Sequence, residues 1–337
     1  MAAERSPGRV LIVNDAFGAL AVGLAAHAPT VWSDAHPSEL AIAHNLVANG
    51  LEAGSVPFVP ADRAPEGAFD LVLARFPKSL AFWEDTLLRL RAHLAADARI
   101  LAGGMIKHTP RRAFDLMDHV LGPTRTTRGW KKARLAEATF DPERDLPARL
   151  PDATWTLDDP PLLVRSGPNV FARDRLDTGS RALLPHLPRD TTGRLADLGC
   201  GNGVLALVLA VRNPAAEVLG VDTSYQAIAS ARANASAAGL GAPRLDFAVA
   251  DGLRSEPPAA LDLVVCNPPF HQDRTVGDML AWRMFTQAER ALRAGGRLLV
   301  VGNTHLDHGE RLARIFGRCR QLARSGKFEV LEAERHA

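Results

Sequence analysis

The sequence has few cysteines, no long apolar run and almost no net charge. Its three cysteines, Cys200, Cys266 and Cys319, are far apart and lack metal-site spacing, which favours a reducing compartment over a disulfide scaffold. No uninterrupted apolar segment reaches the length of a membrane span, and residues 1–9 lack the pattern of a secretory leader. We therefore expect a cytoplasmic protein with no membrane partner and no metal. A net charge of +2 favours no class of partner, and the sequence leaves the oligomeric state open, with a monomer compatible.

The composition is that of an ordinary globular protein. Apolar residues make up 47% of the 337 residues and charged residues 23%, a length and composition that suit about two domains. Short apolar runs alternate with longer helical patterns, which is typical of an α/β fold. In the first half we expect strands and helices in this order: strand 10–13, helix 18–26, strand 31–34, helix 40–47, strand 69–73, helix 80–94 and strand 99–102.

The second half repeats the first. Residues 10–20 align without a gap with residues 195–205, and 45–51 align with 234–240. Asp62 falls on Asp251, and residues 69–78 fall on 261–270. The repeat indicates a duplicated domain.

The two copies differ where ligand chemistry would lie. The second has Asp197, Gly199, Gly201 and Gly203 at the positions where the first has Ile12, Asn14, Ala16 and Gly18. Residues 267–270 of the second copy, Asn-Pro-Pro-Phe, correspond to Arg-Phe-Pro-Lys in the first. We expect the first copy to bind neither cofactor nor reacting group and to act as a scaffold or recognition module.

Three strand ends of the second copy carry side chains suited to a nucleoside. Strand 194–198 leads into the glycine turn 199–203, where the backbone can approach a ligand closely at a helix N-terminus. The next strand ends in Asp222, a carboxylate able to accept from both hydroxyls of a ribose. A third ends in Asp251, which can accept from an adenine amine. A glycine turn alone is a weak signal, but the ordered set favours a nucleoside-containing cofactor.

The fourth strand, residues 261–266, ends in the tetrad Asn267-Pro268-Pro269-Phe270. Proline removes backbone donors, so carbonyls here are available to a ligand. The Asn267 amide oxygen and a neighbouring carbonyl can accept both protons of a planar amine while Phe270 stacks on the attached ring. A plain turn after a buried strand is the alternative for an isolated tetrad of this kind.

A basic stretch in the first copy suits nucleic acid. Between residues 107 and 134 eight basic residues outnumber Asp115 and Asp118, and hydroxyls and a tryptophan are interleaved. Such a mixture suits phosphate and base contacts on RNA, although a charge run is also typical of a solvated face. The candidate RNA contacts are Arg125, Arg128, Trp130, Lys131, Lys132 and Arg134. Residues 141–168 are rich in Pro and Asp and read as a linker.

With these motifs in place, the chain resembles the class I S-adenosylmethionine-dependent methyltransferases, and among them the ribosomal RNA guanine-N2 methyltransferases with duplicated domains. Residues 169–173 and 176–179 resemble the family's lead-in to the cofactor, and residues 267–271 its catalytic tetrad with a following histidine. Residues 121–124, 130–135, 305–307, 315–317 and 327–330 resemble the large-subunit (23S) type. The small-subunit (16S) type shares the architecture and remains an alternative.

The resemblance implies two tandem Rossmann-like domains with mostly parallel seven-stranded sheets. A degenerate domain for RNA recognition is expected at residues 1–145, a linker and lead-in at 146–168, and a catalytic domain at 169–337. The implied cofactor is S-adenosylmethionine and the implied partner is ribosomal RNA. The implied catalytic residues are Asn267, Pro268 and Phe270, with His271 either at the substrate or structural. The implied cofactor contacts are Phe171, Asp177, Asp197, Gly199, Gly201, Gly203, Asp222, Asp251 and Asn267.

Three other functions remain open at this point. A protein glutamine methyltransferase presents a similar tetrad to a flat side-chain amide, but it would not be expected to carry the basic first copy. A nucleic-acid adenine-N6 methyltransferase uses the same arrangement on another base. A non-catalytic RNA-binding assembly factor predicts no cofactor affinity, which the glycine turn and Asp222 argue against.

Overall fold

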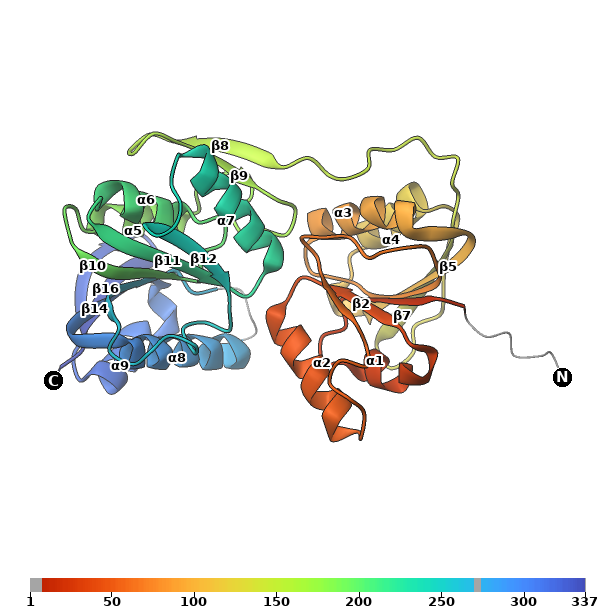
Figure 1. Cartoon of the computed structure of the whole chain (residues 1–337), viewed down its shortest axis with the longest axis horizontal. Helices are drawn as coiled ribbons and strands as arrows, with labels where there is room; N and C mark the ends of the chain where they lie inside the picture. Colours follow the sequence, from red (N-terminus) through yellow and green to blue (C-terminus); the bar gives the residue numbers. More distant parts are fainter. Residues whose placement is uncertain (1–7, 270–273, 337) are drawn as a thin grey trace. The chain divides into compact units, whose positions relative to one another are not determined.

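The computed structural model describes residues 8–269 and 274–336. The chain divides into two compact units, Met1–Pro151 and Asp152–Ala337. Each unit contains a seven-stranded sheet with helices packed on it (Figure 1). This confirms the predicted α/β fold of two Rossmann-like domains.

In the first unit five parallel strands are followed by two antiparallel ones. The order across the sheet is β3-β2-β1-β4-β5-β7-β6, with β7 antiparallel to β5 and β6 antiparallel to β7. The strands are β1 (Val10–Val13), β2 (Thr30–Ser33), β3 (Phe58–Pro60), β4 (Phe69–Arg75), β5 (Leu94–Met105), β6 (Thr124–Thr126) and β7 (Ala133–Thr139).

Helices cover both faces of this sheet because successive strand residues point to opposite sides. Val10 and Ile12 pack with residues of α1 and α2, whereas Leu11 and Val13 belong to the cluster that includes Trp83 and residues of α4. The helices are α1 (Ala19–Gly23), α2 (His36–Ala48), α3 (Leu80–Leu90) and α4 (Arg111–Val120), with 3-10 turns η1 (Ala25–His27), η2 (Arg91–His93) and η3 (Ile106–His108).

The second unit repeats this plan strand for strand. Its order is β12-β11-β10-β13-β14-β16-β15, and only β16 and β15 run antiparallel to their neighbours. The strands are β10 (Gly193–Leu198), β11 (Ala216–Asp222), β12 (Leu245–Val249), β13 (Leu261–Cys266), β14 (Leu292–Asn303), β15 (Arg320–Ser325) and β16 (Phe328–Glu334). From β10 the chain adds β11 and β12 on one side of the sheet and then β13 on the other, so the strand order switches between β10 and β11 on one side and β13 on the other. In such sheets ligands bind at the carboxyl ends of the strands at this switch point.

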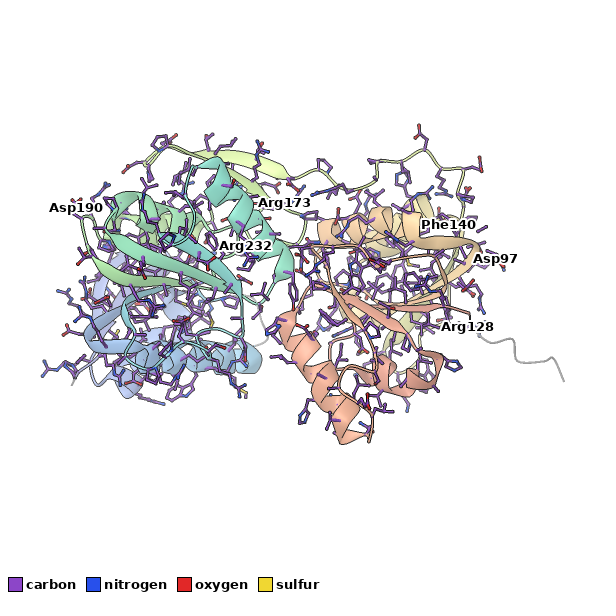
Figure 2. All side chains as sticks on the ribbon, in the orientation of Figure 1. Asp97, Arg128, Phe140, Arg173, Asp190 and Arg232 are labelled. Atoms are coloured by element: carbon purple, nitrogen blue, oxygen red, sulfur yellow. The ribbon has the colours of Figure 1, made fainter. Side chains whose placement is uncertain are left out.

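Helices again pack on both faces of the second sheet. Residues of α5, α6 and α7 form one buried cluster and those of α8 and α9 the other. The helices are α5 (Thr178–Leu183), α6 (Val204–Arg212), α7 (Tyr225–Ala237), α8 (Arg274–Ala291) and α9 (His308–Phe316), with 3-10 turns η4 (Leu184–His186) and η5 (Thr304–Leu306). Arg232, labelled in Figure 2, ties α7 to the sheet by donating to the carbonyl of Phe247 at 2.5 Å.

Residues 146–168, expected to be a linker and lead-in, include an antiparallel hairpin. It consists of β8 (Ala153–Leu157) and β9 (Leu162–Ser166). Val164 is fully buried in the core of the second unit, and the Asn234 side chain of α7 exchanges two hydrogen bonds of 2.8 Å with the backbone of Arg165. The hairpin is therefore part of the second unit's fold.

Some predicted boundaries in the first unit were wrong. The helix expected over 80–94 ends at Leu90, and Leu94 instead begins β5, where it pairs with Phe69. Leu94 continues the apolar spacing of the helix, but its burial comes from pairing with a distant strand. For the same reason β5 starts before the predicted 99–102 and runs through Gly103 and Gly104 to Met105.

Candidate active site

The glycine turn joins β10 to α6 and is fastened to the neighbouring strand. Gly199, Gly201 and Gly203 have φ angles of +82°, +54° and +81°, a region that favours glycine. The amides of Gly199 and Cys200 both donate to the carbonyl of Val221 at 2.8 and 3.0 Å. The turn is therefore a rigid extension of the sheet.

Two of these glycines are needed for different reasons. A Cβ at Gly203 would lie 2.9 Å from the Cβ of Ala231 and 3.0 Å from the Phe247 ring, so this glycine permits close packing inside the fold. A Cβ at Gly201 would have no atom of the described residues within 4 Å. Gly201 therefore borders open space, as a backbone that approaches a ligand must.

Asp222 is held beside the turn at the end of β11. Its Oδ2 accepts from the amide of Gly201 and its Oδ1 from the amide of Ser224, both at 2.9 Å. Burial raises the pKa of this carboxyl. Because each carboxylate oxygen has a second lone pair, the fixed group can still accept from ligand hydroxyls.

Asp197 lies beneath the turn, 1% exposed. Its Oδ2 accepts from the amide of Ala206 in the first turn of α6 at 3.0 Å, and its Oδ1 has no hydrogen-bond partner within the part of the chain that the structure describes. Burial raises the pKa of Asp197 to about 7. The side chain supports the start of α6 from within the core.

This carboxyl predicts a pH dependence of stability. The folded chain keeps its proton up to about pH 7, whereas the unfolded chain releases it near the ordinary pKa of 3.8. Because the folded state binds more protons between these values, the free energy of unfolding should fall as the pH rises from about 4 to about 7. Asp197→Asn retains an oxygen that can accept from Ala206 but does not titrate. Relative to the parent, the free energy of unfolding of the variant should therefore rise by on the order of 2 kcal/mol between about pH 5 and about pH 7.5. Urea unfolding at both pH values tests this, and parallel pH slopes for the two proteins would contradict it.

Asp251 follows β12 and is clamped by α8. Arg283 forms an ion pair with its carboxylate, Nη2 to Oδ1 at 2.8 Å. One turn later, Gln287 accepts from the amide of Leu253 at 3.0 Å and donates to the carbonyl of Asp251 at 3.2 Å. Arg283 and Gln287 were not predicted from the sequence, although two polar residues four apart on a helix share one face and offered a signal. An adenine amine at Asp251 would share this carboxylate with Arg283.

Asn267 directly follows β13, and its amide orientation is fixed. Nδ2 donates to Oδ1 of Asp177 at 3.1 Å and to Oγ of Ser180 at 3.0 Å. Its Oδ1 is buried and has no hydrogen-bond partner within residues 8–269 and 274–336. Both donor hydrogens are used, so this oxygen remains as an acceptor for a ligand that donates.

Asp177 anchors Asn267 from the start of α5. It is the N-cap of that helix, and its Oδ1 accepts from the amides of Gly179 and Ser180 at 2.8 and 3.1 Å. The lead-in before it is fastened to α7, because the amide of Gly167 donates to Ser230 Oγ at 3.1 Å. Phe171, in this lead-in, is 58% exposed. Pro268 is buried, whereas Phe270 and His271 lie outside the described residues.

Gly179 leaves room for the Asn267 amide because it has no Cβ. A Cβ there would lie 2.9 Å from Oδ1 and 3.3 Å from Nδ2 of Asn267. Gly179→Ala should therefore displace this amide and lower kcat by about tenfold while changing cofactor affinity little. Gly309→Ala in α9 is the matched control, because no described atom lies within 4 Å of that Cβ. Steady-state kinetics of both variants test the expectation, and equal kcat values would contradict it.

In the first unit different residues stand at the corresponding strand ends and turn. Asp15 accepts from the amides of Gly18 and Ala21 at 3.1 and 3.0 Å, replacing from the loop the support that Asp197 gives from the strand. Arg89 lies 4.9 Å from the Trp32 ring centroid and donates to the carbonyl of Ala61 at 2.6 Å. By strand register Ser33 stands where the second unit has Asp222.

Part of the predicted RNA-contacting set gathers at one turn of the first unit. Trp130 and Ala133 exchange backbone hydrogen bonds of 2.9 and 2.8 Å across Lys131 and Lys132. Trp130 is 72% exposed, and Lys131 Nζ lies 4.7 Å from its ring centroid. Arg125 on β6 is also exposed, as is Arg128 (Figure 2), whereas Arg134 on β7 is half-buried.

Two kinds of feature are absent from residues 8–269 and 274–336. We find there no helix with the length and hydropathy needed to cross a bilayer. The same residues hold no group of three or more His, Cys, Asp or Glu side chains arranged to bind a metal ion.

Comparison with known proteins covers nearly the whole chain. The family model "Methyltransferase small domain" matches residues 161–332 and "RLMG N-terminal domain" matches residues 1–142. A Pseudomonas putida (strain GB-1) protein named ribosomal RNA large subunit methyltransferase G is 52% identical over 97% of this chain and 87% of its own length. A Pseudomonas aeruginosa (strain UCBPP-PA14) protein of the same name is 50% identical over 96% of this chain and 87% of its own.

The fold is shared with a solved structure. A T. thermophilus 16S rRNA N2 G1207 methyltransferase, in complex with AdoMet and guanosine, matches with a TM-score of 0.81 and 23% sequence identity. The match covers 98% of this chain and 88% of that one. Both units, and not only the second, therefore follow that architecture.

Proposed function

This chain belongs to the family of large-subunit ribosomal RNA methyltransferases G, and we propose that it transfers a methyl group from S-adenosylmethionine to the exocyclic N2 amine of a guanine in 23S rRNA. The second unit is the catalytic part in this proposal, and the first recognises RNA. Guanine and its amine are the part of the proposal that goes beyond family membership.

The buried Oδ1 of Asn267 is the observation that carries the proposal. A buried acceptor without a partner is costly, so its persistence favours a ligand that donates there. An exocyclic amine has two N–H donors, and the carbonyl of Pro268 follows in the chain as a second acceptor. With Asp177 and Ser180 holding Nδ2, the amide cannot turn its own donors toward the amine.

The cofactor fits the residues at the other strand ends. Open space at Gly201 admits a ligand against the backbone, and the fixed carboxylate of Asp222 suits ribose hydroxyls. S-adenosylmethionine supplies a methyl group that is already electrophilic. We assign Asp251 to the adenine amine and Phe171 to the closing lead-in, with Arg283 and Gln287 keeping Asp251 in place.

Catalysis then consists mainly of placement. Methyl transfer would form a C–N bond at the amine as the C–S bond of the cofactor broke, and the proton released by the nitrogen would pass to solvent. Acceptors at Asn267 and Pro268 align the amine and draw its lone pair out of conjugation with the ring. A paired guanine cannot reach such a pocket, so the base must be unpaired or flipped out, with Phe270 proposed to replace part of its stacking. His271 is proposed to contact the substrate.

Transfer of labelled methyl from S-adenosylmethionine to each purified rRNA, followed by nucleoside analysis, tests the proposal. Label in N2-methylguanosine of 23S rRNA is the expected result. Label in 16S rRNA would correct the target, and N6-methyladenosine would correct the base. A protein that binds the cofactor but labels no RNA would contradict the proposal and direct attention to protein glutamine substrates.

A further inference from the structure

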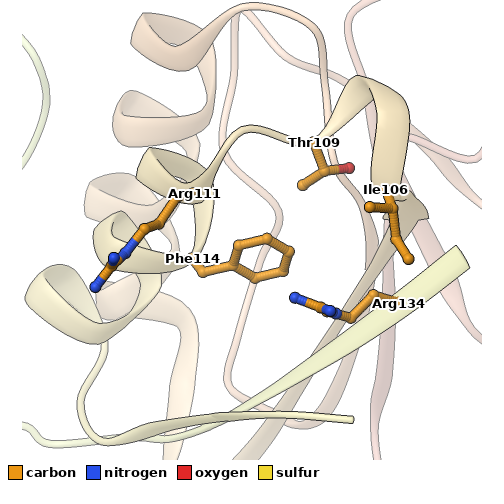
Figure 3. Close-up of a pocket in the computed structure, with 5 residues that line it drawn as sticks. All are labelled: Ile106, Thr109, Arg111, Phe114 and Arg134. Atoms are coloured by element: carbon orange, nitrogen blue, oxygen red, sulfur yellow. The ribbon is translucent and has the colours of Figure 1, made fainter. Parts of the chain in front are cut away.

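A pocket in the first unit has no assigned role. It has a volume of about 200 Å³ and is lined by Ile106, Thr109, Arg111, Phe114 and Arg134 (Figure 3). Water occupies about 30 Å³ per molecule in the liquid, so the pocket has room for a phosphate group and several waters. It lies between η3, the start of α4 and β7. In the strand order, β4 and β5 separate β7 from β1 and the turn that follows β1.

The interior of the pocket is cationic. Figure 3 shows the Arg134 guanidinium directed toward the Phe114 ring, inside the lining residues. Nε of Arg134 is buried and makes no hydrogen bond to any residue that the structure describes. Arg111 also borders the pocket, but its side chain is 93% exposed, lies 3.8 Å from Asp115 and is directed away from the Phe114 ring in Figure 3. A buried guanidinium donor without an acceptor favours an anionic ligand.

The start of α4 adds to the positive electrostatic potential of the pocket. Its N-cap is Pro110, which offers no side-chain acceptor, and Arg111 is the first helical residue. First-turn amides of a helix carry partial positive charge and favour a phosphate in front of them. The pocket therefore combines a helix N-terminus with the guanidinium of Arg134.

The exposed tryptophan turn adjoins the pocket. The amide of Ile106, a lining residue, donates to the carbonyl of Lys132 at 2.9 Å, and a Cβ at Gly129 would lie 2.8 Å from Cδ1 of Ile106. Lys131 and Lys132 have φ angles of +45° and +64°, which is strained for lysine. Strain of this kind is typically kept where a turn has a function, and here the Lys131 ammonium lies 4.7 Å from the Trp130 ring centroid.

We propose that this pocket binds one backbone phosphate of the RNA substrate, with Arg134 as the principal donor, while Trp130 stacks on a neighbouring unpaired base. The inference rests on the proposed function, because it takes RNA as the substrate. In this proposal Arg134 contacts a single phosphate, whereas the exposed lysines attract the RNA backbone generally. Charge and stacking together are the usual means of holding a single strand.

The test measures RNA binding by the full-length chain across a range of salt concentrations. Arg134→Ala should weaken binding about tenfold and reduce the salt slope by about one counterion. Arg99→Ala is the matched control, since Arg99 lies on β5 of the same sheet and pairs with Glu137 on the surface. That variant should bind RNA as the parent does. Arg134→Lys should restore the slope but not the full affinity, because lysine lacks the planar fork.

A second arm identifies the phosphate. RNA in which single linkages are replaced by neutral methylphosphonate should bind the parent about tenfold more weakly at one position, and Arg134→Ala should show no further loss there. Circular dichroism and thermal unfolding like those of the parent, which report on both units, show that the variant is folded. If Arg134→Ala and Arg99→Ala bind RNA equally well, the pocket inference is wrong while the methyltransferase proposal stands. A parent that neither binds nor methylates rRNA would overturn both.

Discussion

Asn267→Ala should lower kcat by about 10³-fold and leave the affinity for S-adenosylmethionine within a few fold. The expectation follows from the amide geometry, because alanine removes the one buried oxygen that we assign to the guanine amine. It also leaves the Gly201 turn and Asp222 untouched, so the cofactor contacts persist. Single-turnover methyl transfer and calorimetric titration of the cofactor measure the two quantities separately.

Ser180→Ala provides a graded comparison for this experiment. It removes one of the two acceptors that hold Asn267 Nδ2 and retains the other, Asp177. We expect kcat to fall about tenfold, between the parent and Asn267→Ala. If Asn267→Ala instead loses cofactor affinity as severely as turnover, the side chain belongs to the cofactor site and its assigned role is wrong.

Gly201→Ala should reduce cofactor affinity by about 100-fold. The added methyl group would stand in the open space beside the turn, where a cofactor must approach the backbone. Backbone strain from the φ of +54° adds a cost to stability of about 1 kcal/mol. Cofactor titration and thermal unfolding together distinguish the two effects.

Gly326→Ala is the control that separates ligand exclusion from strain. Gly326 has a φ of +58° and, like Gly201, has no atom of the described residues within 4 Å of its Cβ. The two substitutions therefore carry similar strain within one unit. Gly326→Ala should destabilise that unit slightly and bind the cofactor normally. Similar cofactor affinities for the two variants would show that Gly201 does not border the cofactor.

The strand ends of the second unit were predictable because their signals are local. Asp222 and Asn267 directly follow apolar runs, and the glycine turn is contiguous in sequence. Arg283 and Gln287 were missed because their role depends on α8 packing beside the loop after β12, a contact between residues more than 30 positions apart. Sequence spacing gives no measure of such a contact.

Asp177 shows a second kind of limit. Its place in the lead-in suggested a cofactor contact, which stays a prediction; the structure adds that its oxygen caps α5 and holds the Asn267 amide, 90 positions away in sequence. The basic stretch was similarly incomplete, since the sequence could not separate the half-buried Arg134 from the exposed Lys131 and Lys132. Hydrogen-bond geometry and burial were needed for both distinctions.

The packing of Arg89 and Trp32 is one of several differences that separate the first unit from the second. Substituting aspartate at Ile12 and glycine at Asn14 and Ala16 would restore the residue types of the glycine turn. Arg89 would still lie over Trp32 and donate to the loop after β3. A carboxylate would also be needed at Ser33, which stands by register where the second unit has Asp222. Several substitutions would therefore be needed together before the first unit presented the turn and acceptors of the second, and no single change restores them.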